Sequence, residues 1–186
     1  MKQKVSDYIA EYIAQWGIRD VFTVTGGGAM HMNDAFGHHK MLHCTYQHHE
    51  QACAMAAEAY ARLGNKMAAV CVTTGPGATN AITGVLGAWM DSIPMLVFSG
   101  QARYATTVSA SGLPLRSMGV QECNIVPVVK SLTKYAHMIV HPENIRYHLE
   151  KALYLAVNGR PGPVWLDIPL DVQGAVIETD DLKAYD

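Results

Sequence analysis

Short apolar segments alternate with helix-like segments along the whole chain, and this alternation constrains the fold most. Strands are expected over residues 21–24, 42–46, 67–72, 95–98, 134–138 and 164–168. Helices are expected over residues 5–16, 29–36, 51–63, 78–90 and 142–157, with a short one near residue 122. Continuously apolar strands are typical of parallel sheets buried on both faces. The sequence therefore predicts a doubly wound α/β fold, a mainly parallel six-stranded sheet with helices on both faces.

The composition sets the number of domains. The chain has 186 residues, of which 49% are apolar and 16% charged. A chain of this length buries enough surface for one full core, so we expect one domain over residues 1–172. Residues 173–186, with the polar run Thr179–Lys183, are expected to begin an inter-domain linker. Charge well below the usual quarter predicts that other domains cover part of the surface.

Charge and targeting signals exclude several kinds of partner. The net charge is −2 without a basic run, which argues against nucleic acid and against an anionic membrane surface. No apolar run reaches the length of a membrane span, so a cytoplasmic protein is expected. The four cysteines are scattered and expected to be free thiols, and neighbouring histidines point in different directions. No protein-bound metal is therefore expected.

Two glycine-rich segments follow predicted strands, at the edge where parallel sheets bind ligands. The segment Gly75–Asn80 has neither the Walker pattern nor the dinucleotide fingerprint. Its small residues suit either an anion at a helix start or a tight turn that needs glycine for geometry alone. The run Gly26–Gly28 indicates close packing against a ligand or a neighbouring chain.

The acidic residue with the clearest functional position is Glu50, which starts a predicted helix after the segment Gln47–His49. A carboxylate there suits the helix dipole, which is one interpretation. The other is a carboxylate in apolar surroundings that shares a proton with a ligand nitrogen. Glu58 is expected to pair with Arg62 in the same helix, and Asp167 to bond backbone at a strand end.

Several motifs in order carry a family resemblance. They are His49–Gln51 followed by Ala57–Arg62, then Thr74–Asn80, Met90–Pro94, Ser99–Gln101 and Gly159–Val164. With these motifs the chain, from Val5 to about Val172, resembles the N-terminal pyrimidine-binding (PYR) domain of thiamine-diphosphate enzymes. The resemblance is to the acetolactate synthase and pyruvate oxidase family.

The resemblance implies a role for specific residues. Glu50 would be the catalytic carboxylate, hydrogen-bonded to N1′ of the cofactor's aminopyrimidine and so promoting loss of the thiazolium C2 proton. The other residues implied to bind the cofactor are Gly26, Gly27, Thr73, Pro76 and Asn80, and those on the substrate side are Val120 and Gln121.

The resemblance also implies partners. The substrate would be a 2-keto acid, and the chain would form a homo-oligomer, a dimer or tetramer, through contacts between PYR domains. The diphosphate and Mg²⁺ would bind a complementary domain through a Gly-Asp-Gly motif, which is absent from this sequence. We therefore expect either a truncated chain or one subunit of a split enzyme, inactive alone.

The sequence departs from acetolactate synthases where substrate specificity is set. Val24 and Thr25 replace the usual Tyr-Pro, the insertion Leu113–Arg116 lengthens one loop, and Val120 replaces a usual Phe. These departures predict a different donor or acceptor. The segment Thr25–His31 is similar to relatives associated with surface-polysaccharide sugar biosynthesis.

Two other functions remain open from the residues. One is a non-catalytic, flavodoxin-like module that binds a phosphate or nucleotide at Gly75–Asn80. The other is a degenerate regulatory paralogue that only forms dimers, although retention of Glu50 argues against it.

Overall fold

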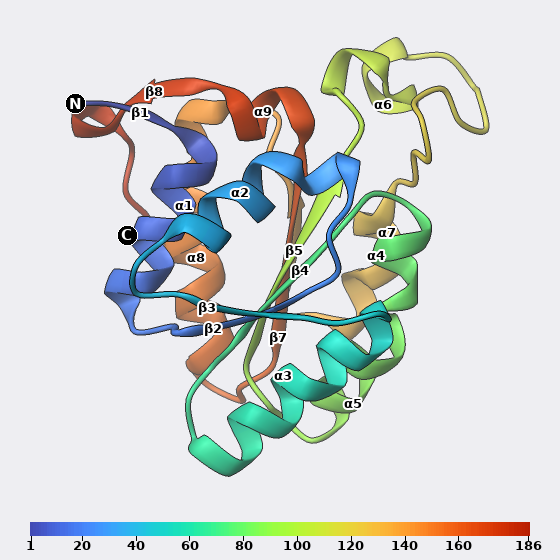
Figure 1. The fold of residues 1–186 in the computed structure, drawn as a ribbon. Helices are drawn as coiled ribbons and strands as arrows, with labels where there is room; N and C mark the ends of the chain where they lie inside the picture. Colours follow the sequence, from blue (N-terminus) through green and yellow to red (C-terminus); the bar gives the residue numbers. More distant parts are fainter.

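The computed structural model describes residues 1–186 and confirms the predicted α/β fold. Its centre is a six-stranded, all-parallel sheet in the order β3-β2-β4-β5-β7-β6 (Figure 1). The strands are β2 (Asp20–Thr23), β3 (His43–Tyr46), β4 (Ala69–Val72), β5 (Met95–Gln101), β6 (Tyr135–Met138) and β7 (Pro163–Pro169). Every residue of β4, β5 and β7 is buried, which explains why these strands are mainly apolar, with Ser99, Gln101 and Asp167 as the buried polar exceptions.

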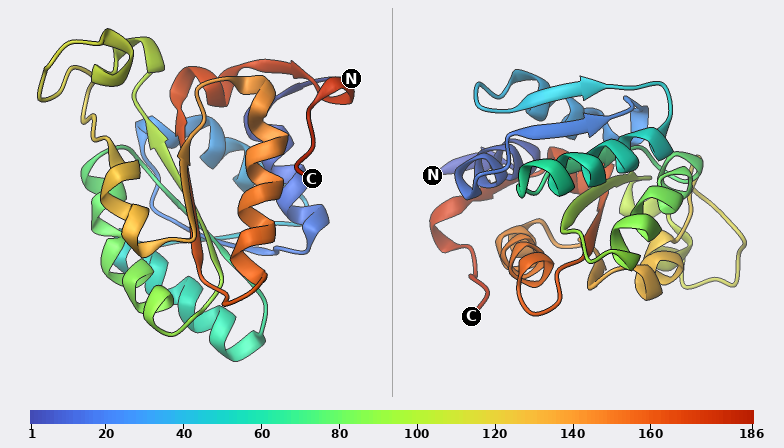
Figure 2. Two further views of the ribbon diagram at one scale, coloured as in Figure 1. Left: turned by 180° about the vertical axis from the view of Figure 1, so that it is seen from behind. Right: turned by 90° about the horizontal axis from the view of Figure 1, so that it is seen from below.

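Helices cover both faces of the sheet (Figure 2). One face carries α1 (Val5–Trp16), α2 (Met30–His38), α8 (Ile145–Val157) and α9 (Leu170–Gly174). The other carries α3 (Glu50–Gly64), α5 (Ile82–Met90) and α7 (Ile125–Val129). Side chains of β4 alternate between the two cores: Cys71 packs in the first, and Val70 and Val72 pack in the second.

One expected helix differs in the structure. The helix expected over residues 78–90 is divided into α4 (Pro76–Asn80) and α5, with Ala81 between them. The short helix expected near residue 122 is α7, which begins three residues later, and the Glu122 carboxylate accepts backbone hydrogen bonds from Val108, Met118 and Gly119. These bonds hold an irregular segment that also contains α6 (Val108–Ser111) and stands out from the body of the molecule (Figures 1 and 2).

The C-terminal segment lies on the domain. A short strand β8 (Val176–Glu178) pairs antiparallel with β1 (Lys2–Lys4), and the side chains of Ile177 and Leu182 are both 7% exposed within the first core. The packed unit thus continues past residue 172, where the sequence led us to expect a linker. Where the domain ends stays a prediction.

Two smaller observations complete the fold. All four cysteines are free thiols, as expected, and Cys53 and Cys71 are buried. None of the helices combines the length and apolar character needed to span a bilayer.

Candidate functional site

The candidate site lies where β2, β3 and β4 end. These strands are neighbours in the sheet, so the loops that follow them meet at one edge. An open cavity of about 610 Å³ lies there. Its lining residues are Glu50, Thr73, Thr74, Pro76, Gly77, Thr79, Asn80 and Gln121. The structure thus brings together five residues that the resemblance singled out, four from the cofactor side and Gln121 from the substrate side.

Glu50 is the only charged residue that lines this cavity. As the first residue of α3 it is half-buried, and its Oε2 accepts a hydrogen bond from Asn80 Nδ2 at 2.7 Å. No protein group hydrogen-bonds its Oε1, which leaves that oxygen free for a ligand. The apolar surroundings of the second interpretation are not formed by α3, because its small apolar side chains, such as Ala54 and Ala57, are buried in the core and do not line the cavity.

The glycines around the cavity are required by packing within the chain. A Cβ on Gly26 would lie 2.4 Å from Thr73 Cβ, and one on Gly77 would lie 2.8 Å from Thr73 Cγ2. Gly75 has φ +59°, and a Cβ there would lie 1.9 Å from the carbonyl oxygen of Gln121. Gly27 alone has open space beside it. These glycines therefore allow the loops to pack closely on Thr73 and Gln121; Gly77 lines the cavity, whereas Gly26 is not among its lining residues.

A second cavity of about 380 Å³ adjoins the first and shares Thr74 and Gln121 with it. Its lining residues are Gly27, Gly28, Met30, Thr74, Gln101, Ala102, Arg103, Thr106, Val120, Gln121 and Leu170. Val120 is 84% exposed, and Gln121 has the unusual backbone angle φ +56°. This second cavity is thus lined both by Gly27, which was expected to bind the cofactor, and by Val120 and Gln121, which were expected on the substrate side.

A buried carboxyl group, Asp167, has partners that the sequence reasoning did not predict. Asp167 is fully buried in β7 and bonds side chains, so the expectation of a backbone bond was wrong. Ser99 Oγ donates to Asp167 Oδ1 at 2.6 Å, and Gln101 Nε2 donates to Oδ2 at 3.1 Å. Burial raises the pKa of Asp167 to about 7, although both hydrogen bonds act to lower it. An acidic residue in the middle of an apolar strand is the signal that could have revealed this network.

Gln101 links this network to the substrate side. Its Nε2 also donates to the carbonyl oxygen of Cys123 at 2.8 Å, and its Oε1 accepts from the backbone of Ala102 at 3.0 Å. Trp165 Nε1 donates to Ser99 Oγ at 2.8 Å and completes the network. The segment that carries Val120 and Gln121 is therefore tied to the centre of the sheet.

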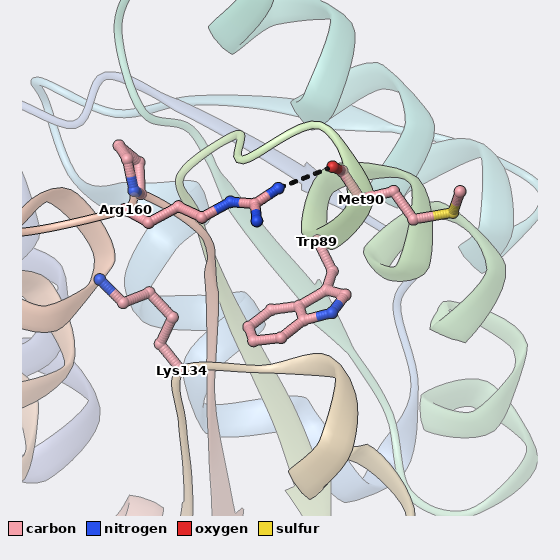
Figure 3. A pocket seen from close by; sticks show the side chains of 5 residues that line it. Trp89, Met90, Lys134 and Arg160 are labelled. Carbon is pink, nitrogen blue, oxygen red and sulfur yellow. Dashed lines mark hydrogen bonds between the residues drawn. The ribbon is translucent and has the colours of Figure 1, made fainter.

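A third cavity, of about 250 Å³, lies at the opposite end of the sheet. Trp89, Met90, Lys134, Arg160 and Pro161 line it, and they precede the strands β5, β6 and β7 (Figure 3). Arg160 donates to the Met90 carbonyl oxygen at 3.3 Å and to Ser92 Oγ at 2.6 Å. Its guanidinium thereby joins two of these loops.

Other charged residues have structural partners. Arg62 pairs with Glu58, as expected, and also contacts Asp91. The chain contains no cluster of three or more His, Cys, Asp or Glu side chains that could hold a metal ion.

Comparison with known proteins assigns this fold and site to a class. A family model described as "Thiamine pyrophosphate enzyme, N-terminal TPP binding domain" matches residues 3–114, more than half of the chain. The chain therefore belongs to the thiamine-diphosphate enzymes, as a pyrimidine-binding domain of that family.

Plant acetolactate synthases are among its relatives. Acetolactate synthase 2, chloroplastic, of Zea mays is 36% identical over 174 residues, which is 92% of this chain and 26% of the relative. Acetolactate synthase, chloroplastic, of Arabidopsis thaliana is 35% identical over 174 residues, 92% of this chain and 24% of the relative. The chain thus spans about a quarter of the length of these relatives.

Proposed function

We propose that this chain is the pyrimidine-binding half of a thiamine-diphosphate enzyme that decarboxylates a 2-keto acid and joins the remaining fragment to a carbonyl acceptor. The products would be CO₂ and a hydroxyketone. The observation that carries the proposal is the Glu50 carboxyl group, held by Asn80 through one oxygen and free at the other within an open cavity.

The residues present fit the cofactor's aminopyrimidine. Glu50 Oε1 would hydrogen-bond N1′, and the ring would lie against the cavity wall that includes Thr73, Pro76 and Gly77. When bound, thiamine diphosphate supplies an electron sink that accepts the electrons released when CO₂ leaves a 2-keto acid.

The protein's own contribution is positioning and proton exchange. Asn80 donates to Oε2 and thereby fixes the orientation of the Glu50 carboxyl group. Oε1 would then exchange a proton with a ring nitrogen, which is general acid–base catalysis by a positioned carboxyl group. Thr73, packed between Gly26 and Gly77, would shape the wall against which the ring lies.

The rest of the active site would come from a complementary domain. The diphosphate and Mg²⁺ would bind there, because this chain has neither a Gly-Asp-Gly motif nor a cluster of metal ligands. Contacts between PYR domains would form the homo-oligomer, a dimer or tetramer. The much greater length of the acetolactate synthases supports the requirement for further domains.

The flavodoxin-like alternative gains no support from the geometry. It requires an anion at the start of the helix that follows Gly75, but α4 has only five residues. So short a helix has a weak macrodipole and few free N–H groups aligned on one ligand.

The substrates would differ from those of acetolactate synthases. Val120 lines the second cavity in place of a usual Phe and so leaves more room there. The inserted Leu113 and Leu115 precede Val120 in the same segment, and their side chains are 57% and 44% exposed. They are therefore available to a substrate or a partner domain.

The decisive experiment is Glu50→Gln in the enzyme assembled with its complementary domain. We expect turnover of pyruvate, measured as CO₂ release, to fall about 100-fold or more, because the amide cannot exchange the proton. Exchange of the cofactor's C2 proton with deuterium, followed by NMR, should slow in parallel.

Glu58→Gln is the matched control, because it removes a carboxylate from the same helix at its pair with Arg62. It should leave both rates within about twofold of wild type, since an exposed pair contributes little. Wild-type exchange in Glu50→Gln would refute the proposed role of Glu50.

A further inference from the structure

We infer that the second cavity binds the acceptor substrate, and that Arg103 binds an anionic group which the acceptor keeps through the reaction. This inference rests on the proposed function and specifies its substrate class: a carbonyl compound with a carboxylate or phosphate ester away from its reacting carbon.

Charge in the cavity singles out Arg103. Its guanidinium is the only charged group among the eleven lining residues. It forms no ion pair within 4.0 Å and donates no side-chain hydrogen bond to the protein. An arginine in this state offers a planar fork of donors that matches carboxylate and phosphate oxygens.

The neighbouring acidic groups are already occupied. Asp171 Oδ1 accepts from the backbone N–H groups of Tyr104 and Val172, at 3.0 and 3.2 Å. Both carboxylate oxygens of Glu122 accept backbone hydrogen bonds within its own loop. Backbone N–H groups thus hold the carboxylates of Asp171, in α9, and Glu122, and neither forms an ion pair with Arg103.

A second group in the cavity lacks a partner. Thr74 is 3% exposed, and its Oγ1 is buried without any hydrogen bond. This oxygen is enclosed beside Gly28 and has almost no exposed surface, so Thr74 contributes to the wall and offers no ligand-binding hydroxyl. Thr74 lines both cavities and therefore marks the route from Glu50 toward Arg103.

The other polar groups divide into occupied and free. Gln101 uses its amide for Asp167, Cys123 and Ala102, so it builds the wall and has little left for a ligand. The Gln121 side chain has no hydrogen bond to the protein and lines both cavities. Gln121 and Arg103 thus are the two lining side chains whose polar groups remain free for a ligand.

The chemistry assigns the anion to the acceptor. The donor loses its carboxylate as CO₂, and a cation paired with that carboxylate would stabilise the ground state and slow its loss. The acceptor loses nothing, so binding its anionic group can position its carbonyl at no cost to the chemical step. A cavity of about 380 Å³ is in the size range of small-molecule sites.

The test compares matched acceptors that differ in charge. Comparing the affinity for succinic semialdehyde with that for butanal tests recognition of a carboxylate. Comparing glyceraldehyde 3-phosphate with glyceraldehyde tests recognition of a phosphate. The variants are Arg103→Gln, Arg103→Lys and the control Arg116→Gln, which removes an exposed arginine of the same segment outside the cavity. Saturation-transfer NMR on the assembled enzyme gives the dissociation constants without a donor, so this readout needs no turnover. Carboligation kinetics give KM and kcat.

We expect Arg103→Gln to weaken one anionic acceptor about ten- to a hundredfold in KM and dissociation constant, with its neutral partner unchanged. Arg103→Lys should restore part of the affinity, and Arg116→Gln should have no effect. The pair that responds identifies the anion as carboxylate or phosphate.

Equal effects on charged and neutral acceptors would overturn the inference, as would equal effects in Arg116→Gln or no effect with any probe. The failure of the proposed function would look different. It would appear as full turnover in Glu50→Gln, whatever the four probes do.

Discussion

The carboxyl group of Asp167 should make the stability of the domain fall as the pH rises. It lies in the centre of the sheet, accepts hydrogen bonds from Ser99 and Gln101, and has a pKa raised by burial to about 7 from the ordinary value of 3.8. Between these two values the unfolded chain has lost the proton and the folded protein still holds it. Stability from this group is therefore complete at low pH and is lost as the pH rises through 7.

The size of the effect follows from the pKa difference. A shift of about three units corresponds to about 4 kcal/mol at most, and about 2 kcal/mol of this is lost between pH 5 and pH 7. Asp167→Asn removes the titration. The oxygen of the new amide can still accept a hydrogen bond from Ser99, but its NH₂ group faces the NH₂ group of Gln101, and two donors cannot bond each other. This lost hydrogen bond should therefore lower the free energy of unfolding of the variant by an amount that does not change with pH, and the variant should lack the pH dependence that Asp167 gives the wild type.

The assay is urea unfolding of wild type and Asp167→Asn from pH 5 to pH 8. The difference in unfolding free energy should move by about 2 kcal/mol in favour of the variant as the pH rises from 5 to 7. The difference cancels other titrating groups, such as His148, whose lowered pKa acts in the opposite direction. Measurements below pH 8 avoid titration of the Cys123 thiol, because burial, and next the charge of Asp167, raise its pKa. If the unfolding free energies of wild type and Asp167→Asn change with pH in parallel, the reasoning is refuted.

Two further predictions concern backbone and histidine. Gly75→Ala should destabilise the fold by about 2 kcal/mol or more in urea unfolding, because its Cβ would lie 1.9 Å from the Gln121 carbonyl oxygen at φ +59°. Gly87→Ala, in open space on α5, should instead stabilise by up to about 1 kcal/mol; the same sign for both would contradict this. Burial, and next the neighbouring His137, lower the pKa of His148 to about 4. An NMR titration of the His148 ring should give this value, and a pKa near 6.5 would contradict the prediction.

The alternation of apolar and helical segments predicted the architecture because a fully buried strand is mainly apolar. Each strand of the sheet appears where one was expected, with its ends shifted by at most three residues. The meeting of Glu50, Thr73 and Asn80 was predictable for a related reason: the carboxyl ends of neighbouring parallel strands share one edge. Their roles at the cofactor came from family resemblance alone and stay predictions.

The missed features depend on contacts between residues distant in sequence. The pairing of β1 with β8 joins segments more than 170 residues apart, and neither shows an apolar pattern long enough to predict a strand. The bonds of Asp167 come from Ser99 and Gln101 on the neighbouring strand, so the choice between a backbone and a side-chain partner needed the register. The hydrogen bonds of Glu122 to Val108 and Met118 likewise depend on how the loop folds back, which its sequence does not show.

The antiparallel pair of β1 and β8 also indicates that the order of the segments along the chain could be changed without changing the sheet. Lys2 lies opposite Glu178, and the amino group of Met1 contacts Asp180, so the first residues lie beside the segment that ends six residues before Asp186. Circular permutation is tolerated best when the ends are adjacent and the new break falls in an exposed turn. The exposed turn at Asn65, between α3 and β4, meets the second condition. A permuted chain that starts at residue 66 and ends at residue 65 would keep every strand beside its present neighbours.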